Sequence, residues 1–390
     1  MGRAAVRTIK RVPEQPPVLA GHADSGLPTR AEVLDDEGRG RLSRGNKAVL
    51  AAFFLFLAVM VVGSVVHLPY AVMSPGPTQD TLGVSDDGKK TPIIAISGLP
   101  TYPTEGSLRF TTVRVEGGPG YPVDAWDVLQ AWIDPAQDVF PVDDIFDPKV
   151  TQEQVAEENA IQMEGSQEEA TAVALRAIGK DVPTHVAIAS ITDSSKAKGL
   201  LKVRDRLESI DDEPITTAQS VRDALQKSSP GDTVSLTVTR DGKELTVDVP
   251  TVEGQGGRTA LGVLLGLDHD FPAKVTIDAG AIGGPSAGLM FSLGIYDKLT
   301  PGPLAGDHQI AGTGTIDDDG KVGQIGGIRQ KLAGARSGGA QFFLAPAGNC
   351  DEVVGHVPDG LEVFKVATFD EARTAVEAIA RNQTGSLPRC

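Results

Sequence analysis

The chain has 390 residues and a formal net charge of −16, from 36 Lys and Arg against 52 Asp and Glu. This length favours two or three compact units, because single hydrophobic cores stop growing at roughly 250 to 300 residues. The acidic balance argues against a large nucleic-acid interface, which needs a basic surface. With only two Cys, the chain is not a small disulfide scaffold.

An apolar segment at residues 48–67 predicts a transmembrane helix. It begins AVLAAFFLFLAVMVVGSVV and carries no charged side chain. At a rise of about 1.5 Å per residue it spans a hydrocarbon core of about 30 Å. A signal peptide is the alternative, but the run is too long for its apolar core and no A-x-A cleavage site follows.

The charges that flank this segment predict its orientation. Lys and Arg precede it up to Lys47, and the next basic residue after it is Lys89. The positive-inside rule therefore places the N-terminus in the cytoplasm and the rest of this single-pass chain outside the cell membrane. Residues 1–47 are expected to be a disordered cytoplasmic tail, and the Pro- and Gly-rich residues 68–89 a tether.

Short strand-like runs and one long helix are expected next. TPIIAISG and SLRFTTVRVE alternate like strands, and Trp126, Trp132 and Phe140 are expected to be packing anchors. Residues 150–179 are rich in strong helix formers. Apolar residues recur there at helical spacing, at Met163, Ala170, Val173, Ala174 and Ala177.

Residues 183–252 change character. A strand-like HVAIASI is followed by GLLKVRDRLESIDDEPI, a helical SVRDALQKSS, and a hairpin VSLTVTRDGKELTVDV that turns at Asp241-Gly242. This order resembles a PDZ domain of the bacterial protease type, which implies a groove where a peptide adds as a strand, with HVAIASI as the groove strand. No Gly-Leu-Gly-Phe-like loop is seen, and a β-rich spacer is the alternative. A Gly-rich linker, VEGQGGRTA, is expected to close this unit.

The sequence GGPSAG precedes an apolar, helix-periodic run. Pro285 suits the first turn of a helix, so Ser286 is expected at a helix N-terminus, where unpaired N–H groups and the dipole stabilise a developing oxyanion. Gly284 and its small neighbours let a substrate backbone approach. Taken alone, this pattern is more often a helix cap or an anion site.

A serine needs a base to act as a nucleophile. His269, His308 and His356 lie in no recognisable catalytic motif. Lys331, in GGIRQKLAGARS, is expected at the start of a short helix among apolar residues, a setting that lowers the pKa of an amine. Taken alone, Lys331 is better explained as a solvated helix lysine.

The two motifs together change that balance. GGPSAG, then IAGTGTIDDDGKVGQIGG, then IRQKL closely resemble the proteolytic domain of Lon proteases, which use a Ser-Lys dyad. The resemblance implies that Ser286 is the nucleophile, Lys331 the general base, and Thr313 a residue that orients the lysine. It also implies an oxyanion hole of backbone N–H groups from Gly284 through Pro285 to Ser286. Gly283 stands where the family often has an acidic residue.

The resemblance extends beyond these motifs. SLRFTTVRVE and SQEEATAVALRAIG look like the opening strands and first long helix of the Lon fold. We therefore expect an α+β or α/β multidomain fold in which the PDZ-like domain is inserted into a Lon-type domain of residues 90–181 and 256–380, with a tail at 381–390. The whole chain resembles the membrane-anchored PDZ-Lon proteases of bacteria.

These resemblances imply a function. No G-x-x-x-x-G-K-[ST] motif occurs, so we expect an ATP-independent serine endopeptidase that cuts extracytoplasmic proteins or peptides, needs no cofactor or metal, and has no nucleic-acid partner. Lon-type domains commonly assemble in rings, so a homo-oligomer is an option. The alternative is a membrane-anchored PDZ adaptor whose Lon-like domain is idle or is activated by a partner.

Two further groups of residues are interpreted structurally. Asp317, Asp318 and Asp319 are expected to form a hairpin turn and not a metal site, because they lack the spacing of a calcium loop. An oxidising exterior would permit a disulfide between Cys350 and Cys390, and two free thiols are the alternative.

Overall fold

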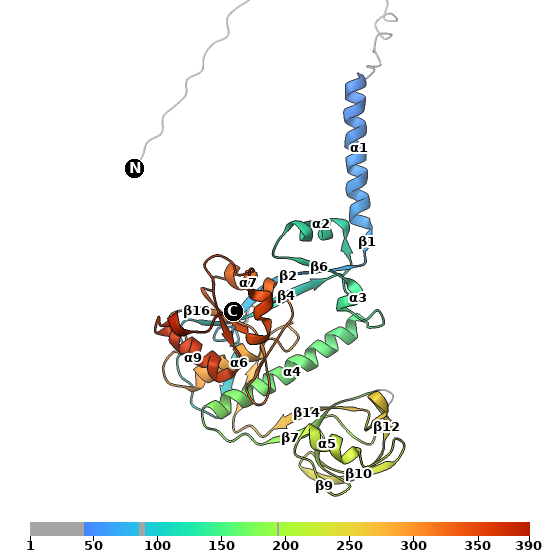
Figure 1. The fold of residues 1–390 in the computed structure, drawn as a ribbon, viewed down its shortest axis with the longest axis vertical. Helices are drawn as coiled ribbons and strands as arrows, with labels where there is room; N and C mark the ends of the chain where they lie inside the picture. The colour runs from blue at the N-terminus through green and yellow to red at the C-terminus, as the bar shows by residue number, and fades with distance from the viewer. Residues whose placement is uncertain (1–42, 86–89, 193–194) are drawn as a thin grey trace, which may run out of the picture. The chain divides into compact units, whose positions relative to one another are not determined.

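The structure, a computed structural model, describes residues 43–85, 90–192 and 195–390 (Figure 1). The chain divides into two units, Met1–Met60 and Val61–Cys390. The apolar helix α1 (Arg44–Val65) has no buried residue, and its most apolar window has a mean hydropathy of 2.7. Among the described residues it is the one helix long and apolar enough to cross a membrane.

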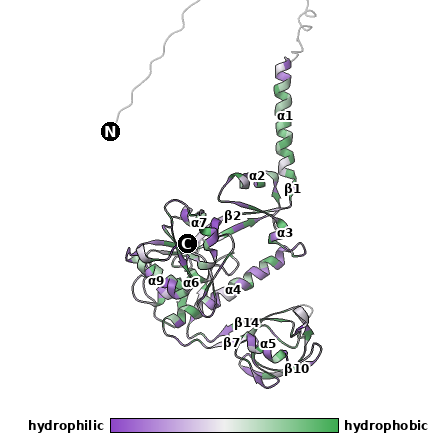
Figure 2. Cartoon of the chain, viewed as in Figure 1, coloured by the Kyte–Doolittle hydropathy of each residue, from purple (hydrophilic) through white to green (hydrophobic). Residues whose placement is uncertain are grey.

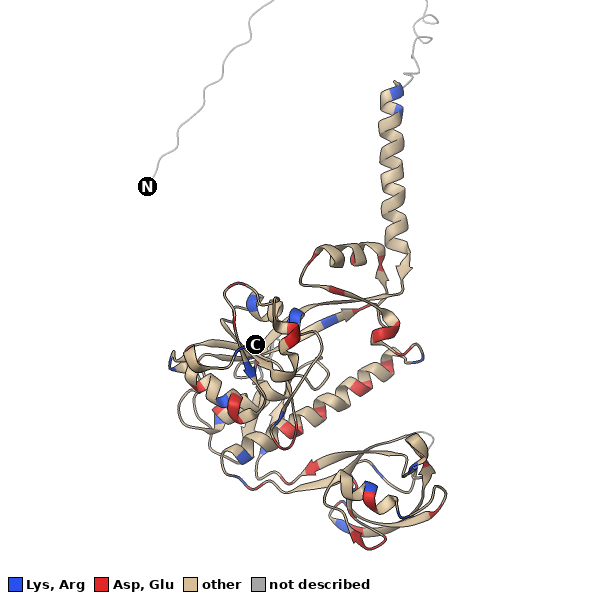
Figure 3. Cartoon of the chain, in the orientation of Figure 1, with Lys and Arg blue, Asp and Glu red and all other residues tan. Residues whose placement is uncertain are grey.

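Charge and hydropathy along α1 follow the pattern that the sequence predicts. The helix is hydrophobic along its length (Figure 2), and its basic residues lie at its N-terminal end (Figure 3). It begins at Arg44, earlier than the predicted start at 48. The expected disordered tail falls, up to residue 42, outside the described residues.

The expectation of a tether over residues 68–89 is wrong. Tyr70–Asp80 form β2, which pairs with strands on both sides inside a six-stranded sheet. The Pro- and Gly-rich stretch that looked like a linker is a β-bulge, because the register with β4 shifts between Pro75 and Thr78. A bulge tolerates Pro, since it interrupts the ladder of backbone hydrogen bonds.

The six-stranded sheet joins segments from both sides of the PDZ-like region. Its order is β20-β19-β16-β4-β2-β6. The four strands β20, β19, β16 and β4 run parallel, and β2 is antiparallel to β4 and to β6. The other members are β4 (Ser107–Glu116), β6 (Asp138–Pro141), β16 (Gln309–Gly312), β19 (Phe342–Pro346) and β20 (Glu362–Val366).

Helices cover both faces of this sheet. On β19, Leu344 joins the core cluster that contains residues of α4, α6 and α9, whereas Phe343 and Ala345 join the cluster that contains residues of α7. This alternation is that of a strand buried on both faces. These helices are α4 (Gln152–Ala177), α6 (Gly288–Leu299), α7 (Ile328–Ser337) and α9 (Phe369–Ala380).

The long helix α4 confirms the predicted periodicity. A capping box between Thr151 and Gln154 starts it, because each side chain bonds the backbone N–H of the other. Of the residues predicted to be apolar at helical spacing, Met163, Ala170, Val173 and Ala174 are buried and Ala177 is half-buried. The run 170–175 is buried on all sides, and acidic residues recur along the rest of the helix (Figure 3).

A second sheet has the order β11-β10-β8-β7-β14, with β9 paired to β8. The predicted hairpin is confirmed, since Arg240 pairs with Lys243 across Asp241 and Gly242, whose φ angles of 51° and 73° are those of a type I′ turn. Its elements are β7 (Thr184–Ile191), β8 (Arg206–Ile210), β9 (Glu213–Pro214), α5 (Ala218–Leu225), β10 (Thr233–Arg240), β11 (Lys243–Pro250) and β14 (Val263–His269).

The expected groove strand is wrong. HVAIASI lies in β7, which is paired on both sides, by β8 and by β14. In the described part of the chain β14 is paired on one side only, so it is an edge strand of this sheet, and β11 forms the opposite edge. It comes from beyond the predicted boundary at 252, after the expected linker, in which β12 (Val252–Glu253) pairs with β13 (Thr259–Ala260). The order of elements along the sequence does not show that the chain returns to pair β14 with β7.

A small group of short elements follows α1. β1 (His67–Leu68) pairs with β5 (Val123–Asp124), and α2 (Ala125–Ile133) packs beside β2 and β6. Trp132, expected to be a packing anchor, is instead 69% exposed. The remaining elements are β3 (Ile94–Ser97), α3 (Val142–Ile145), η1 (Gln255–Gly257), β15 (Lys274–Ile277), β17 (Thr315–Ile316), β18 (Val322–Gly323), η2 (Ala347–Asn349), α8 (Cys350–Val353) and η3 (Thr384–Ser386).

Candidate active site

Ser286 lies in the turn that leads into α6. The helix begins at Gly288 with Ala287 as its cap, so the expectation that Pro285 occupies the first helical turn is wrong. Gly284 has a φ of 86°, and its N–H donates to the carbonyl of Asn159 at 2.9 Å. This left-handed residue turns the chain away from a helical path before the proline.

The long helix α4 holds this turn in place. The Ser166 hydroxyl donates to the carbonyl of Pro285 at 2.9 Å. A Cβ on Gly288 would lie 2.7 Å from Ser166 Oγ, so only glycine allows this approach. No sequence pattern indicated Ser166 or Asn159, because both act across a packing contact and stand in an ordinary polar stretch of helix.

Lys331 lies in the first turn of α7, as predicted, but it is buried. The residue is 2% exposed, and its side chain is one of the largest that are fully buried in the described chain. Its Nζ donates to Ser286 Oγ at 2.7 Å and to Thr313 Oγ1 at 2.9 Å. The structure thus brings the three residues of the predicted site together.

Thr313 fixes the direction of the lysine. Its hydroxyl lies 3.0 Å from the carbonyl oxygen of Ser286, and a carbonyl only accepts hydrogen bonds, so the threonine proton points there. The Thr313 oxygen is then left to accept from Lys331 Nζ. When the amine is neutral, it can keep this bond to Thr313 and accept the Ser286 proton on its lone pair.

Burial sets the charge of Lys331. Burial lowers the pKa of the ammonium from 10.5 to about 7, because the charged form loses its hydration and has no carboxylate partner among the described residues. Near neutral pH a large fraction of Lys331 is therefore neutral and able to accept a proton.

The oxyanion donors are fewer than expected. The N–H of Gly284 is bonded to Asn159, and Pro285 has none, so neither supplies a donor. The Ser286 N–H has no acceptor among the described residues. Gly314 donates to the Ser286 carbonyl at 2.9 Å and fixes the orientation of that peptide.

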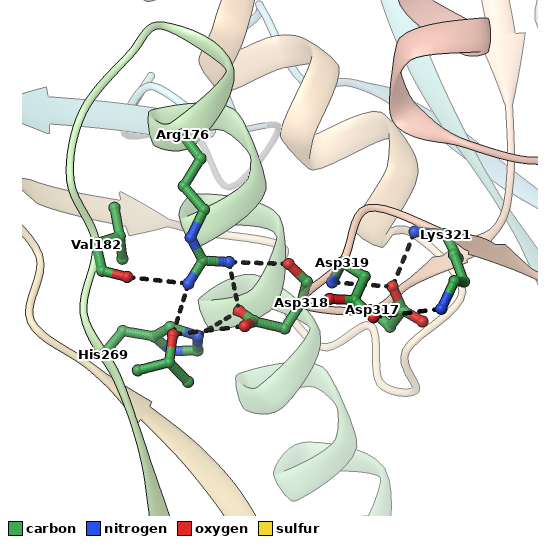
Figure 4. Close-up of polar contacts among 8 residues, drawn as sticks. Arg176, Val182, His269, Asp317, Asp318, Asp319 and Lys321 are labelled. Carbon is green, nitrogen blue, oxygen red and sulfur yellow. Dashed lines mark hydrogen bonds and ion pairs between the residues drawn. The ribbon is translucent and has the colours of Figure 1, made fainter. Parts of the chain in front are cut away.

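Asp317, Asp318 and Asp319 form the turn of the β17–β18 hairpin, as predicted. Asp317 Oδ1 accepts from the N–H groups of Asp319 and Lys321 at 3.1 and 2.8 Å (Figure 4). In the described chain no group of three or more His, Cys, Asp or Glu is placed to hold a metal ion.

Asp318 is the shared acceptor in a cluster of polar contacts at the end of β14 (Figure 4). Its Oδ1 lies 2.8 Å from Arg176 Nη1 and 2.7 Å from His269 Nε2. Burial disfavours its ionised form, but the bonds from His269 and Arg176 outweigh that cost and lower the pKa to about 2. His269, which lacked a motif, therefore joins β14 to the hairpin and does not contact Ser286.

The two cysteines form a disulfide, with 4.9 Å between their Cα atoms. The expected tail at 381–390 is thereby tied to the domain, and the Lys365 N–H also donates to Pro388. Beside Cys350, the buried Asn349 side chain bonds both the N–H and the carbonyl of Ile325, shortly before α7 begins.

Comparison with known families agrees with this geometry. Residues 160–251 match the PDZ domain, and residues 267–378 match the Lon protease (S16) C-terminal proteolytic domain. The chain combines a PDZ domain with a Lon-type proteolytic domain. The second match includes Ser286, Thr313 and Lys331.

Two relatives of this chain are Lon proteases. "Lon protease 2" of Bacillus subtilis is 34% identical over 102 residues, which are 26% of this chain and 17% of that protein. "Lon protease" of Buchnera aphidicola from Schizaphis graminum is 31% identical over 172 residues, with 36% and 22% covered. This chain thus spans about a fifth of their length.

Among solved structures, the PDZ domain of the SdrC-like protein of Listeria monocytogenes is similar to this chain. It is 23% identical, covers 21% of this chain and 86% of that domain, and has a TM-score of 0.20.

Proposed function

We propose that the protein is an ATP-independent, membrane-anchored serine endopeptidase that uses Ser286 and Lys331 as a dyad. The observation that carries the proposal is the 2.7 Å contact between Lys331 Nζ and Ser286 Oγ, with the lysine buried and its pKa lowered to about 7. A buried amine without an ion-pair partner is costly, and such a group is typical of a site selected for chemistry.

In the proposed reaction, Lys331 accepts the Ser286 proton as Oγ attacks the substrate carbonyl. The Ser286 N–H donates a hydrogen bond to the oxyanion of the tetrahedral intermediate. The ammonium of Lys331 then protonates the leaving amine, and an ester remains on Ser286. Lys331 next takes a proton from a water molecule as the water oxygen attacks the ester carbonyl. Lys331 then returns this proton to Ser286 Oγ as the ester bond breaks, which releases the acid product and restores Ser286.

The test uses the full chain in detergent micelles, without ATP, and unfolded casein. Wild type is expected to cleave, and Ser286→Ala and Lys331→Met are expected to lose cleavage with unchanged thermal unfolding. Lys321→Met, whose side chain is 68% exposed on the nearby hairpin, is the matched control and should keep full activity. Cleavage that survives in Ser286→Ala would refute the dyad.

The PDZ domain is proposed to present substrates on β14. An edge strand has unpaired backbone groups that an extended peptide can join. The half-buried Val263 and Leu265 pack against the cluster that contains Val221 of α5, whereas Leu264 is 57% exposed. The proposed peptide site is therefore the free edge of β14, beside the apolar cluster that includes Val221.

Paired variants on β14 test this presentation. Val263→Asp places a charge in the proposed peptide site, and Leu264→Asp places one on the exposed side. Val263→Asp is expected to raise KM for casein and to leave kcat for a short peptide unchanged, because only substrate binding is lost. Leu264→Asp should change neither value. Equal effects of both variants would contradict the presentation role.

The membrane anchor and its orientation are also proposals, supported by the length and apolar character of α1 and the basic residues at its start. External protease added to intact cells should digest residues beyond α1 only. Digestion confined to the segment before α1 would reverse the orientation.

A further inference from the structure

The short helix α2 begins where the apolar helix ends. His67, which follows α1 by two residues, pairs with Asp124, and Asp124 is the N-cap of α2. Two residues of chain reach at most about 7 Å, and paired strands lie about 5 Å apart. The first turn of α2 therefore lies within about 15 Å of the end of α1.

A direct contact strengthens this placement. A Cβ on Gly63, in the last turn of α1, would lie 2.4 Å from the indole nitrogen of Trp126. The indole therefore packs directly against the glycine, and the last turn of α1 and the first turn of α2 touch.

The two faces of α2 differ in what covers them. Val128 and Ala131 are buried in a small apolar cluster with Val72 and Val123. Leu129, Trp132 and Ile133 are 43%, 69% and 75% exposed. They stand at positions i, i+3 and i+4, so they form one apolar stripe, which continues from Trp126.

Charge favours a lipid occupant of this stripe. In the nine residues of α2 the one charged side chain is Asp127, whose carboxylate is bonded to the N–H of Asp124 in the capping box. Tryptophan is enriched at the membrane interface, because its ring is apolar and its N–H is polar. A short helix with an exposed Leu, Trp and Ile beside a membrane span fits that layer.

We propose that α2 lies in the membrane interface, with Leu129, Trp132 and Ile133 among the lipid headgroups and upper acyl chains. This inference rests on the proposed anchoring by α1. The bilayer is the occupant because the contacts to His67 and Gly63 hold α2 at the end of the span, whatever else binds the protein.

The position of α2 bears on the active site. Residues 134–137 join α2 to β6, where Asp138 accepts from Arg329 Nη1 at 2.8 Å and from Gln330 Nε2 at 2.7 Å. These donors precede Lys331 on α7. A helix held by lipid therefore supports the strand to which the lysine helix is bonded.

The test uses the full chain in phosphatidylcholine vesicles, with and without lipids brominated on the acyl chain, which quench nearby indoles. In Trp126→Phe, Trp132 is the one remaining tryptophan. Its fluorescence is expected to fall in brominated vesicles, and more with bromine near the headgroup than near the chain end. In the control, both native tryptophans are replaced by Phe and Val354→Trp places the indole at a position that is 63% exposed outside α2. The fluorescence of this control should be the same in brominated and in plain vesicles.

A second probe leaves Trp126 unchanged. Ile133→Cys is labelled with a bimane dye, which is specific because both native cysteines are in the disulfide. Vesicle flotation separates the two proposals. A chain that does not float refutes the anchor. If the chain floats but the probe at position 132 or 133 is not quenched, the docking of α2 is overturned and the anchor is kept. The same conclusion holds if a second copy covers the stripe, which would shift the emission to the blue without quenching.

Discussion

His269 Nε2 lies 2.7 Å from Asp318 Oδ1, so the last residue of β14 is bonded to the hairpin that follows Thr313. This pair joins the edge strand of the PDZ domain to the proteolytic domain. Arg176 of α4 completes the cluster, because it donates to the same carboxylate oxygen of Asp318.

Asp318→Asn is expected to lower kcat several-fold for casein and for a short peptide, because the hairpin loses its charged bonds to β14 and α4. The matched control is Asp319→Asn, whose side chain is 77% exposed. Steady-state kinetics check both variants, and equal activity in the two would contradict the role of the cluster.

The stability of the same variant should depend on pH. Asp318 has a pKa lowered to about 2, so its contribution is present above its unfolded pKa of 3.8 and is lost as pH falls toward 2. The difference in melting temperature between wild type and Asp318→Asn is therefore expected to be largest near pH 7 and to shrink below pH 4. A constant difference would exclude this linkage.

Activity is expected to rise with pH through about 7. Lys331 must be neutral to accept a proton, and its pKa is lowered to about 7, so the neutral fraction grows across that range. The value of kcat/KM for a short uncharged peptide, measured from pH 5.5 to 8.5, should follow one ionisation. A profile that falls over this range would exclude Lys331 as the base.

Thr313→Val should lower kcat by about 10- to 100-fold, because Lys331 loses its acceptor and the Ser286 carbonyl loses a donor. Thr313→Ser keeps the hydroxyl and is expected to restore most of the rate. Wild-type-like kinetics in Thr313→Val would show that the Lys331–Ser286 contact suffices.

Asp297→Asn should stabilise the fold above pH 6. Asp297 is fully buried in α6, its Oδ1 accepts from Leu304 at 2.9 Å, and its Oδ2 has no partner among the described residues. Burial raises its pKa from 3.8 to about 6, so stability is lost as pH rises through this window.

The amide keeps one acceptor oxygen and carries no charge. Asp297→Asn is expected to gain about 1 to 2 kcal/mol in the free energy of unfolding at pH 8 and little at pH 4. Urea unfolding at the two pH values measures this, with the exposed Asp307→Asn as control. A gain of equal size at both pH values would point to packing instead of charge.

The sequence indicated Ser286 and Lys331 as a pair, through the resemblance of two motifs taken together, and the structure places the two side chains in contact. Their catalytic roles remain a prediction. The residues that support the pair were not predicted. Asn159 and Ser166 hold the Ser286 turn through contacts from a distant helix, and such contacts leave no mark in a local pattern.

Long-range pairing also explains the errors in the fold. The edge position of β14 depends on a return of the chain that its own alternation does not encode. The exposure of Trp132 depends on what lies beside α2, and a hydrophobic residue at helical spacing is compatible with a core or with a membrane surface.

The absence of a tether limits where this protein can act. β2 begins at Tyr70, shortly after α1 ends at Val65, and runs as a strand into the six-stranded sheet. There α7, which carries Lys331, packs beside the middle of β2 at Gly76. From His67 to Gly76 a strand extends about 30 Å. Under the proposed anchoring by α1, this short connection keeps the proposed dyad within a few nanometres of the lipid. The proposal then implies that substrates tethered to the bilayer, or newly emerged from it, meet the site far more often than proteins that diffuse freely.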